Sequence, residues 1–178
     1  MSALTLEGII GFLLDTPMFA GLEPEELTQI VHIMQIQRVR DGQRVFREGE
    51  AGDAWYVVFD GQVSVTKERV LGPSEELARL GSQVCFGEMA LIDGSPRSAS
   101  VSACGEGTLF RFAKKDFDEL LADGNLSAFK LVHEMAKVLC ERQRNMTNRV
   151  TTLVSGDTSA EAAIDQLRQV AEEHSVHE

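Results

Sequence analysis

The stretch WYVVFDGQVSVT, from Trp55 to Thr66, decides the fold class of this chain. It contains two short runs of β-branched and aromatic residues, separated by the pair Asp60-Gly61. Such residues favour strands, and an Asp-Gly pair between two apolar runs is a strong local signal for a hairpin turn. The stretch therefore predicts two strands that meet at Asp60-Gly61.

The strand-like pattern continues over residues 35–113, where glycines and two more Asp-Gly pairs mark further turns. Many short strands at this spacing are typical of a β-barrel or a two-sheet jelly roll. Helical periodicity flanks the region and predicts helices over residues 4–14 and 24–34, a short helix from Lys114 that ends at Asp123-Gly124, and a long helix over 126–154. We therefore expect an α+β protein, a jelly-roll β-barrel with N-terminal helices and a long C-terminal helix.

The length of 178 residues suits one domain with a sizeable core. We expect this domain to cover residues 1–155, with N-terminal helices over 1–34, the barrel over 35–113 and C-terminal helices over 114–155. Residues 156–178 are acidic and predict a weakly held helical tail.

The charge of the chain argues against two classes of partner. Its 28 acidic and 17 basic residues give a net charge of -11, which repels nucleic acid and anionic membranes. No apolar run approaches the roughly 20 residues that a membrane-spanning helix needs. Three cysteines without a CxxC pair indicate reduced thiols and a cytoplasmic protein. An anionic ligand would therefore need a local positive site.

The long helical segment carries a regular apolar stripe. Its positions step by three and four and are Phe129, Val132, Ala136, Leu139, Met146, Val150 and Leu153, with Gln143 in the same register. Such a stripe can pack on its own barrel or on a partner helix, and its length favours a homodimer through residues 129–153.

A second stretch, FGEMALIDGSPRSASV from Phe86 to Val101, carries the chemistry. The guanidinium of Arg97 can donate two parallel hydrogen bonds to a phosphate, and Ser98 adds a hydroxyl. Gly87 lets the backbone approach a ligand, and the helical turn after it offers free N–H groups. Glu88 would repel phosphate but can accept a hydrogen bond from a sugar hydroxyl. A site for one phosphate and one ribose fits both charges, and a structural Glu88–Arg97 ion pair without ligand fits them as well.

This stretch resembles the phosphate-binding cassette of the cyclic nucleotide-binding domain family. That family occurs in bacterial cAMP receptor proteins, in regulatory subunits of cAMP-dependent protein kinase and in cyclic-nucleotide-gated channels. The similarity extends upstream to REGEAGDAWYVVFDGQVSV and downstream to TLFRFAKKDFDELL, and covers roughly residues 17–150.

The resemblance implies roles for the matching positions. Glu88 would bind the ribose 2′-hydroxyl, and Arg97 would pair with the cyclic phosphate. Backbone amides around Gly87, Met89 and Ala90, and near Ala99, would complete the cradle. Ser98 can donate a hydrogen bond to the phosphate of cAMP or of cGMP, so this residue does not distinguish the two nucleotides. We expect cAMP.

In the family the helix after the barrel covers the base and often forms the dimer. Arg142 and Gln143 interrupt the apolar stripe here, so we expect them near the base, with Arg142 stacked on it. A solvated arginine and a glutamine that sets helix register explain the same two residues equally well.

About two dozen residues follow Leu153, too few for the helix-turn-helix of DNA-binding relatives. No Ser-His-Asp or metal-ligand pattern stands out, so we expect neither an enzyme, nor a metal, nor a cofactor. Two functions remain. One is a cyclic-nucleotide sensor whose ligand repositions the C-terminal helix and changes a dimer or effector surface. The other is a partner-binding scaffold with a vestigial or cGMP-type pocket.

Overall fold

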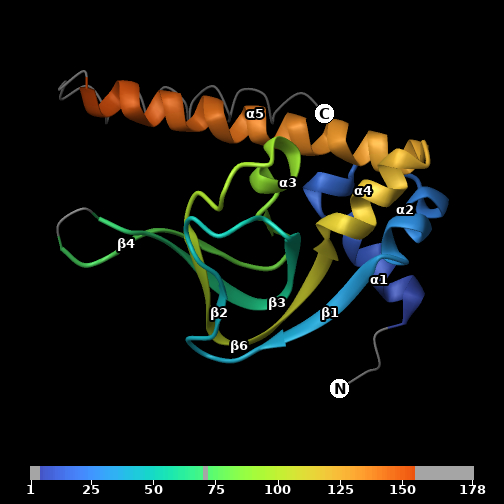
Figure 1. Ribbon diagram of the computed structural model, residues 1–178, viewed down its shortest axis with the longest axis horizontal. Coiled ribbons are helices and arrows are strands. Elements are labelled where there is room, and N and C mark those ends of the chain that lie inside the picture. Colours follow the sequence, from blue (N-terminus) through green and yellow to red (C-terminus); the bar gives the residue numbers. More distant parts are fainter. Residues whose placement is uncertain (1–4, 70–71, 155–178) are drawn as a thin grey trace, which may run out of the picture. The chain divides into compact units, whose positions relative to one another are not determined.

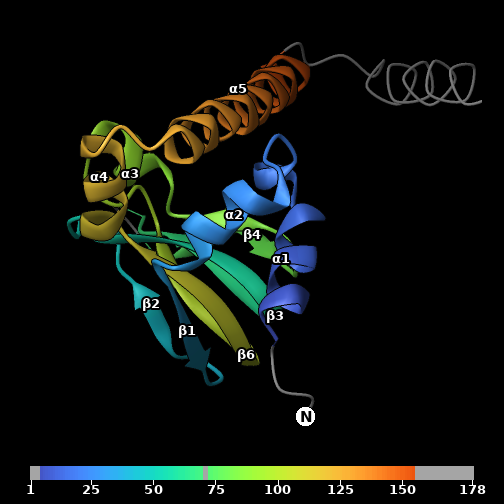
Figure 2. The same cartoon turned by 90° about the vertical axis from the view of Figure 1, so that its right-hand side faces the viewer.

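A computed structural model describes residues 5–69 and 72–154, and Figures 1 and 2 show it in two views. Its contacts divide the chain into two compact units, Met1–Val138 and Leu139–Glu178. The first unit holds the sheet and the cassette, and the second holds the later turns of the long helix. The predicted acidic tail over residues 156–178 lies outside the described residues.

Three short helices open the first unit: α1 (Leu6–Leu14), the 3-10 helix η1 (Pro17–Phe19) and α2 (Pro24–Val31). The side chain of Thr5 caps α1 by accepting the N–H of Gly8 at 3.1 Å. The predicted end of the second helix at residue 34 is wrong. Met34 already pairs with Phe112 in the sheet, because strand pairing takes over where the helix ends.

The sheet consists of six antiparallel strands: β1 (Met34–Val39), β2 (Arg44–Phe46), β3 (Ala54–Lys67), β4 (Glu75–Leu80), β5 (Cys85–Phe86) and β6 (Ser100–Ala113). The strand order is β1-β6-β3-β4, with β2 also paired to β6 and β5 to β3. Figure 1 shows β6 and β3 running through the centre of this sheet. The predicted fold class, a jelly-roll β-barrel with flanking helices, is confirmed.

The predicted hairpin at Asp60-Gly61 is wrong, because β3 is one strand from Ala54 to Lys67. Its register against β6 shifts on either side of Asp60. Gly61 has a φ of +86°, and a Cβ there would lie 2.8 Å from the carbonyl oxygen of Glu106. The Asp-Gly pair therefore forms an irregularity inside a strand, where a close backbone approach requires glycine.

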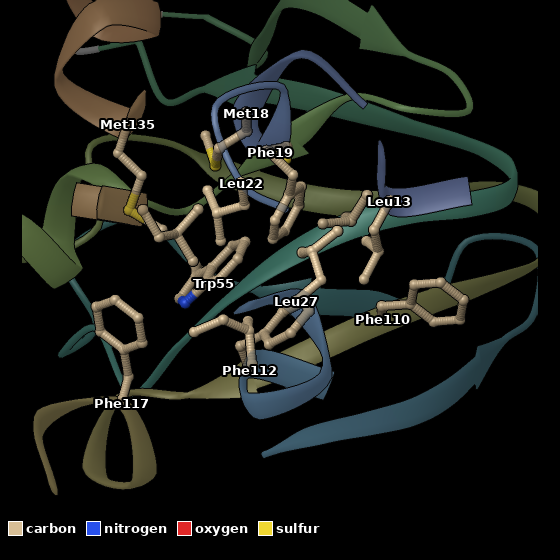
Figure 3. Packing of buried hydrophobic residues seen from close by; sticks show 14 of the residues in the cluster. Leu13, Met18, Phe19, Leu22, Leu27, Trp55, Phe110, Phe112, Phe117 and Met135 are labelled. Atoms are coloured by element: carbon tan, nitrogen blue, oxygen red, sulfur yellow. The ribbon is translucent and has the colours of Figure 1, made fainter. Parts of the chain in front are cut away.

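The two faces of β3 and β6 contribute to two separate cores. Trp55 and Phe112 face the helices, and their rings stack with centroids 4.1 Å apart. Figure 3 shows this core, in which Trp55 and Phe112 lie among side chains of α1, η1, α2 and the first turns of the last helix. Tyr56 and Val58, on the opposite face of β3, join a second core with Phe46 and Phe86. Both faces of β3 are buried, which explains the continuous apolar run at its start.

Two helices follow the sheet, α4 (Lys114–Ala122) and α5 (Leu126–Val154). Within the first unit, α5 buries Ala128, Leu131 and Met135 against the helix-side core. Phe129 of the predicted stripe is 51% exposed, so the domain-facing side of the helix is offset from that stripe. On the described turns of the second unit, Met146 and Val150 are exposed. The homodimer through residues 129–153 stays a prediction.

Among the described residues, none of the helices has both the length and the hydropathy that crossing a bilayer requires.

Candidate phosphate-binding site

The stretch Phe86–Val101 folds as the end of β5, a short helix α3 (Met89–Asp93) and a loop that leads into β6. Gly87 precedes α3 with a φ of +81°, and Gly94 ends it with a φ of +67°. These two left-handed glycines make the chain turn into and out of the helix, as glycine does more readily than other residues. The two turns bring Gly87 and Arg97 together.

Arg97 lies at the centre of the candidate site and is 3% exposed. Its Nη1 donates to the carbonyl oxygen of Gly87 at 2.9 Å, and its Nη2 donates to that of Ala54 at 2.6 Å. Nη2 also pairs with the Oδ1 of Asp53 at 3.2 Å. The guanidinium carbon lies 4.1 Å from the centre of the Phe46 ring. These contacts fix the plane of the guanidinium.

The Nε of Arg97 is buried and has no hydrogen-bond partner among the described residues. A buried donor without an acceptor costs free energy, so such groups are rare in native structures. An anionic oxygen would satisfy this donor with a charge-assisted hydrogen bond. The arrangement is therefore that of an arginine held by the protein through Nη1 and Nη2, with its Nε–H left for a ligand.

Gly87 is required at this site for two reasons. Its left-handed φ disfavours other residues, and a Cβ there would lie 2.8 Å from the Nη1 of Arg97. A second close approach occurs at Gly52, where a Cβ would lie 2.3 Å from the Cβ of Ala90. The two glycines let Arg97 and α3 pack directly against backbone.

Glu88 is the residue before the first turn of α3, and it is 2% exposed. Its carbonyl oxygen accepts the N–H groups of Leu91 and Ile92 at 3.1 and 3.2 Å. The sequence left open a structural ion pair between Glu88 and Arg97. The carboxylate that pairs with Arg97 at 3.2 Å in the structure belongs to Asp53.

Sequence reasoning missed Asp53, which lies 44 residues before Arg97. Its carboxylate bridges two arginines, because its Oδ2 accepts from the Nη2 of Arg111 at 2.8 Å. Burial acts to raise the pKa of Asp53, but the Arg111 hydrogen bond and the charges of Arg111 and Arg97 outweigh it and lower that pKa. No local pattern around Asp53 marks it as a partner of Arg97, since only the fold brings them together.

Burial raises the pKa of Tyr56, which also interacts with Arg111. Arg111 in turn donates through Nη1 to the side-chain oxygen of Gln35 at 2.9 Å. Asp53 and Arg111 thus connect the Arg97 guanidinium to strands β1, β3 and β6 through side-chain contacts.

The other predicted site residues occupy different environments. Ala90 and Ala99 are buried, whereas Met89 and Ser98 are exposed. Arg142 and Gln143 lie on exposed turns of α5 in the second unit. Their predicted contact with a base stays a prediction, and so do the ligand roles of the cassette residues.

The sequence is similar to that of known proteins with a cyclic nucleotide-binding domain. Residues 36–123 match the family model described as "Cyclic nucleotide-binding domain". The chain is 33% identical over 129 residues to the cyclic AMP receptor protein of Thermus thermophilus, which covers 72% of this chain and 58% of that protein. It is 37% identical over 111 residues to the cAMP-dependent protein kinase regulatory subunit of Yarrowia lipolytica, covering 62% and 29%.

A solved cyclic nucleotide-binding domain from Methylobacillus flagellatus superposes with a TM-score of 0.73 and 25% identity, covering 86% of each chain. The matched segment spans less than two thirds of either of the two sequence relatives. The similarity therefore concerns a domain that those longer proteins also contain.

Proposed function

Because residues 36–123 form a domain of the cyclic nucleotide-binding family, we propose that this chain binds a cyclic nucleotide and acts as a regulatory sensor. The observation that carries the proposal is the buried Arg97, fixed by protein contacts yet with its Nε–H lacking a partner among the described residues. We favour cAMP as ligand, since the names of two relatives refer to cAMP. The proposed activity is binding and not catalysis.

In this proposal the cyclic phosphate accepts a hydrogen bond from Arg97, and backbone amides near Gly87, Met89, Ala90 and Ala99 supply further donors. Glu88 accepts a hydrogen bond from the ribose 2′-hydroxyl. Glu88 is 2% exposed and lies within the cassette, directly before the first turn of α3, and this position supports the role. Ser98 is exposed beside Arg97 and adds a hydroxyl donor.

The output of the sensor is assigned to α5. A ligand can shift the helix only if it binds better to one helix position than to another. Met146 and Val150 are 64% and 53% exposed on the described turns of the second unit, which supports a contact with a second copy or with an effector protein. Arg142 and Gln143 lie on these turns as candidate contacts with the base.

The test is isothermal titration calorimetry of the chain with cAMP, cGMP and 5′-AMP. We expect cAMP to bind most tightly and 5′-AMP, which lacks the cyclic phosphodiester, to bind weakest. Arg97→Ala should abolish binding, and Arg97→Lys, which keeps the charge but loses the fork, should weaken it strongly. Lys115→Met is the control for removal of one positive charge, because Lys115 lies on α4 and forms an exposed ion pair there with Glu119.

Circular dichroism verifies that the Arg97 variants fold, since Arg97 also serves the structure. If the wild-type chain binds none of the three nucleotides, the sensor proposal is wrong and the scaffold function is favoured. If Arg97→Lys binds cAMP as well as the wild type does, the assignment of the phosphate to Arg97 is wrong.

A further inference from the structure

We infer that Lys67 and Glu48 are positioning residues that hold the cassette backbone so that the Ala99 amide can face the phosphate. This inference rests on the proposed function, because it concerns how the same site presents its donors. Neither residue belongs to the cassette, and they contact it at Ser98 and Ser100 instead of at the guanidinium of Arg97.

The contacts form a closed ring. The Nζ of Lys67, at the end of β3, donates to the carbonyl oxygen of Ser98 at 2.7 Å. The same ammonium pairs with the Oε1 of Glu48 at 2.7 Å. The backbone N–H of Glu48 returns to the cassette by donating to the Oγ of Ser100 at 2.9 Å. The backbone N–H of Glu68 donates to the Oε2 of Glu48 at 3.1 Å and fixes that carboxylate.

A second pair of hydrogen bonds anchors the same segment one residue earlier. The N–H of Gly49 donates to the carbonyl oxygen of Arg97 at 2.9 Å, and the N–H of Arg97 donates to that of Glu50 at 2.8 Å. Two successive cassette carbonyls, those of Arg97 and Ser98, are therefore both turned toward groups outside the cassette.

Because the peptide bond is planar, the direction of each of these carbonyls also sets the direction of the N–H that follows it. In a trans peptide the carbonyl and the next N–H point in opposite directions, and no cis peptide occurs among the described residues. When Lys67 holds the carbonyl of Ser98, the N–H of Ala99 must point away from Lys67. When Gly49 holds the carbonyl of Arg97, the N–H of Ser98 must point away from Gly49.

The opposite charges of Lys67 and Glu48 make it possible to distinguish an effect of backbone orientation on ligand affinity from an effect of charge attraction. Lys67 is positive and Glu48 is negative, so loss of the one or the other changes the net charge in opposite directions. A long-range electrostatic effect on an anionic ligand would weaken binding in a Lys67 variant and strengthen it in a Glu48 variant. Loss of orientation weakens binding in both.

The first experiment titrates cAMP into Lys67→Met, Glu48→Ala and the control Lys115→Met by calorimetry at one ionic strength. We expect both ring variants to bind about tenfold more weakly, the size of effect that loss of a well-placed hydrogen bond to a charged group produces. The control should stay within about twofold of the wild type. Lys67→Arg, which can bridge the same two oxygens, should recover most of the affinity.

The second experiment reads the backbone without relying on affinity. In ¹⁵N-¹H spectra of the ligand-free protein, the Ala99 amide signal should move in Lys67→Met and not in Lys115→Met. Added cAMP should shift that signal downfield in the wild type and much less in Lys67→Met.

The inference is overturned if both ring variants bind cAMP like the wild type, or if Glu48→Ala binds more tightly. An unmoved Ala99 signal in ligand-free Lys67→Met would overturn it as well. Absence of cAMP binding to the wild type would instead defeat the proposed function and the ligand role of the ring with it, while the ligand-free spectra would still report whether the ring orients Ala99.

Discussion

Arg97 and Asp53 form an ion pair of 3.2 Å in which the arginine side chain is 2% exposed and the aspartate side chain is 66% exposed. The aspartate thus reaches a buried guanidinium from the surface, and its other oxygen binds Arg111 at 2.8 Å. The positive charge of Arg97 is therefore paired with a carboxylate that lies at the protein surface, in contact with solvent. This relationship makes Asp53 a suitable place to test the electrostatics of the site.

We predict that Asp53→Asn lowers the free energy of unfolding at pH 7 by up to about 1 kcal/mol, since the ion pairs are partly screened by solvent. The pKa of Asp53 is lowered in the folded protein, so its stabilisation is full above the ordinary aspartate value and is lost as the pH falls below it. Urea unfolding of both proteins at pH 7, 4 and 3 measures this. The difference should shrink between pH 4 and pH 3, and a constant difference would contradict the prediction.

Gly87→Ala should weaken cAMP binding more than an equally strained glycine substitution elsewhere. The matched control is Gly105→Ala, outside the cassette, because both glycines have a left-handed φ but only Gly87 lies against Arg97, with nothing within 4 Å of a Cβ at Gly105. Both variants should lose roughly 1–2 kcal/mol of stability from backbone strain. Calorimetry with cAMP should show a large loss of affinity for Gly87→Ala alone, and equal affinities would argue against the guanidinium contact.

Gly61→Ala should destabilise the sheet by more than Gly105→Ala. Both positions have positive φ values near +85°, but a Cβ at Gly61 would collide with the backbone of Glu106, and a Cβ at Gly105 meets nothing within 4 Å. We expect the collision to add about 1–3 kcal/mol to the strain that both variants share. Thermal unfolding monitored by circular dichroism compares them, and similar melting temperatures would contradict a close backbone approach at Gly61.

Met146→Glu should disrupt a homodimer if the predicted stripe forms the interface. Met146 belongs to the stripe, while Asn148 is exposed on the same helix and lies outside it. A charge in the seam of paired helices lacks a partner, whereas a charge at Asn148 stays in solvent. Light scattering after size-exclusion chromatography should find a monomer for Met146→Glu and a dimer for Asn148→Glu. A monomeric wild-type chain would defeat the dimer prediction itself.

The sequence was sufficient for the fold class because the relevant signals are local. Alternating apolar runs predicted the strands, and periods of three and four predicted the flanking helices. The cassette was also visible, since Gly87, Glu88 and Arg97 lie within eleven consecutive residues of one motif, 87–97. The motif and its spacing do not depend on the rest of the chain.

Local signals failed where strand pairing with a distant segment opposes the local preference of the same residues. The pair Asp60-Gly61 has the composition of a turn, yet pairing of β3 with β6 on both sides of it keeps one strand. The second helix ends early because Met34 pairs with Phe112. In both cases long-range strand pairing outweighs a local preference, since it satisfies several backbone groups at once.

The amino-acid sequence by itself determined that this chain is a barrel with helices and that it carries an arginine and a glutamate in a glycine-bounded cassette. Only the tertiary structure decided which groups hold that cassette. Asp53, Phe46, Lys67 and Glu48 reach Arg97 and its neighbours from other strands and loops. The physical reason is that residues far apart in the sequence come into contact only when the register of every strand and the geometry of every turn between them are set. A short stretch of sequence does not determine these.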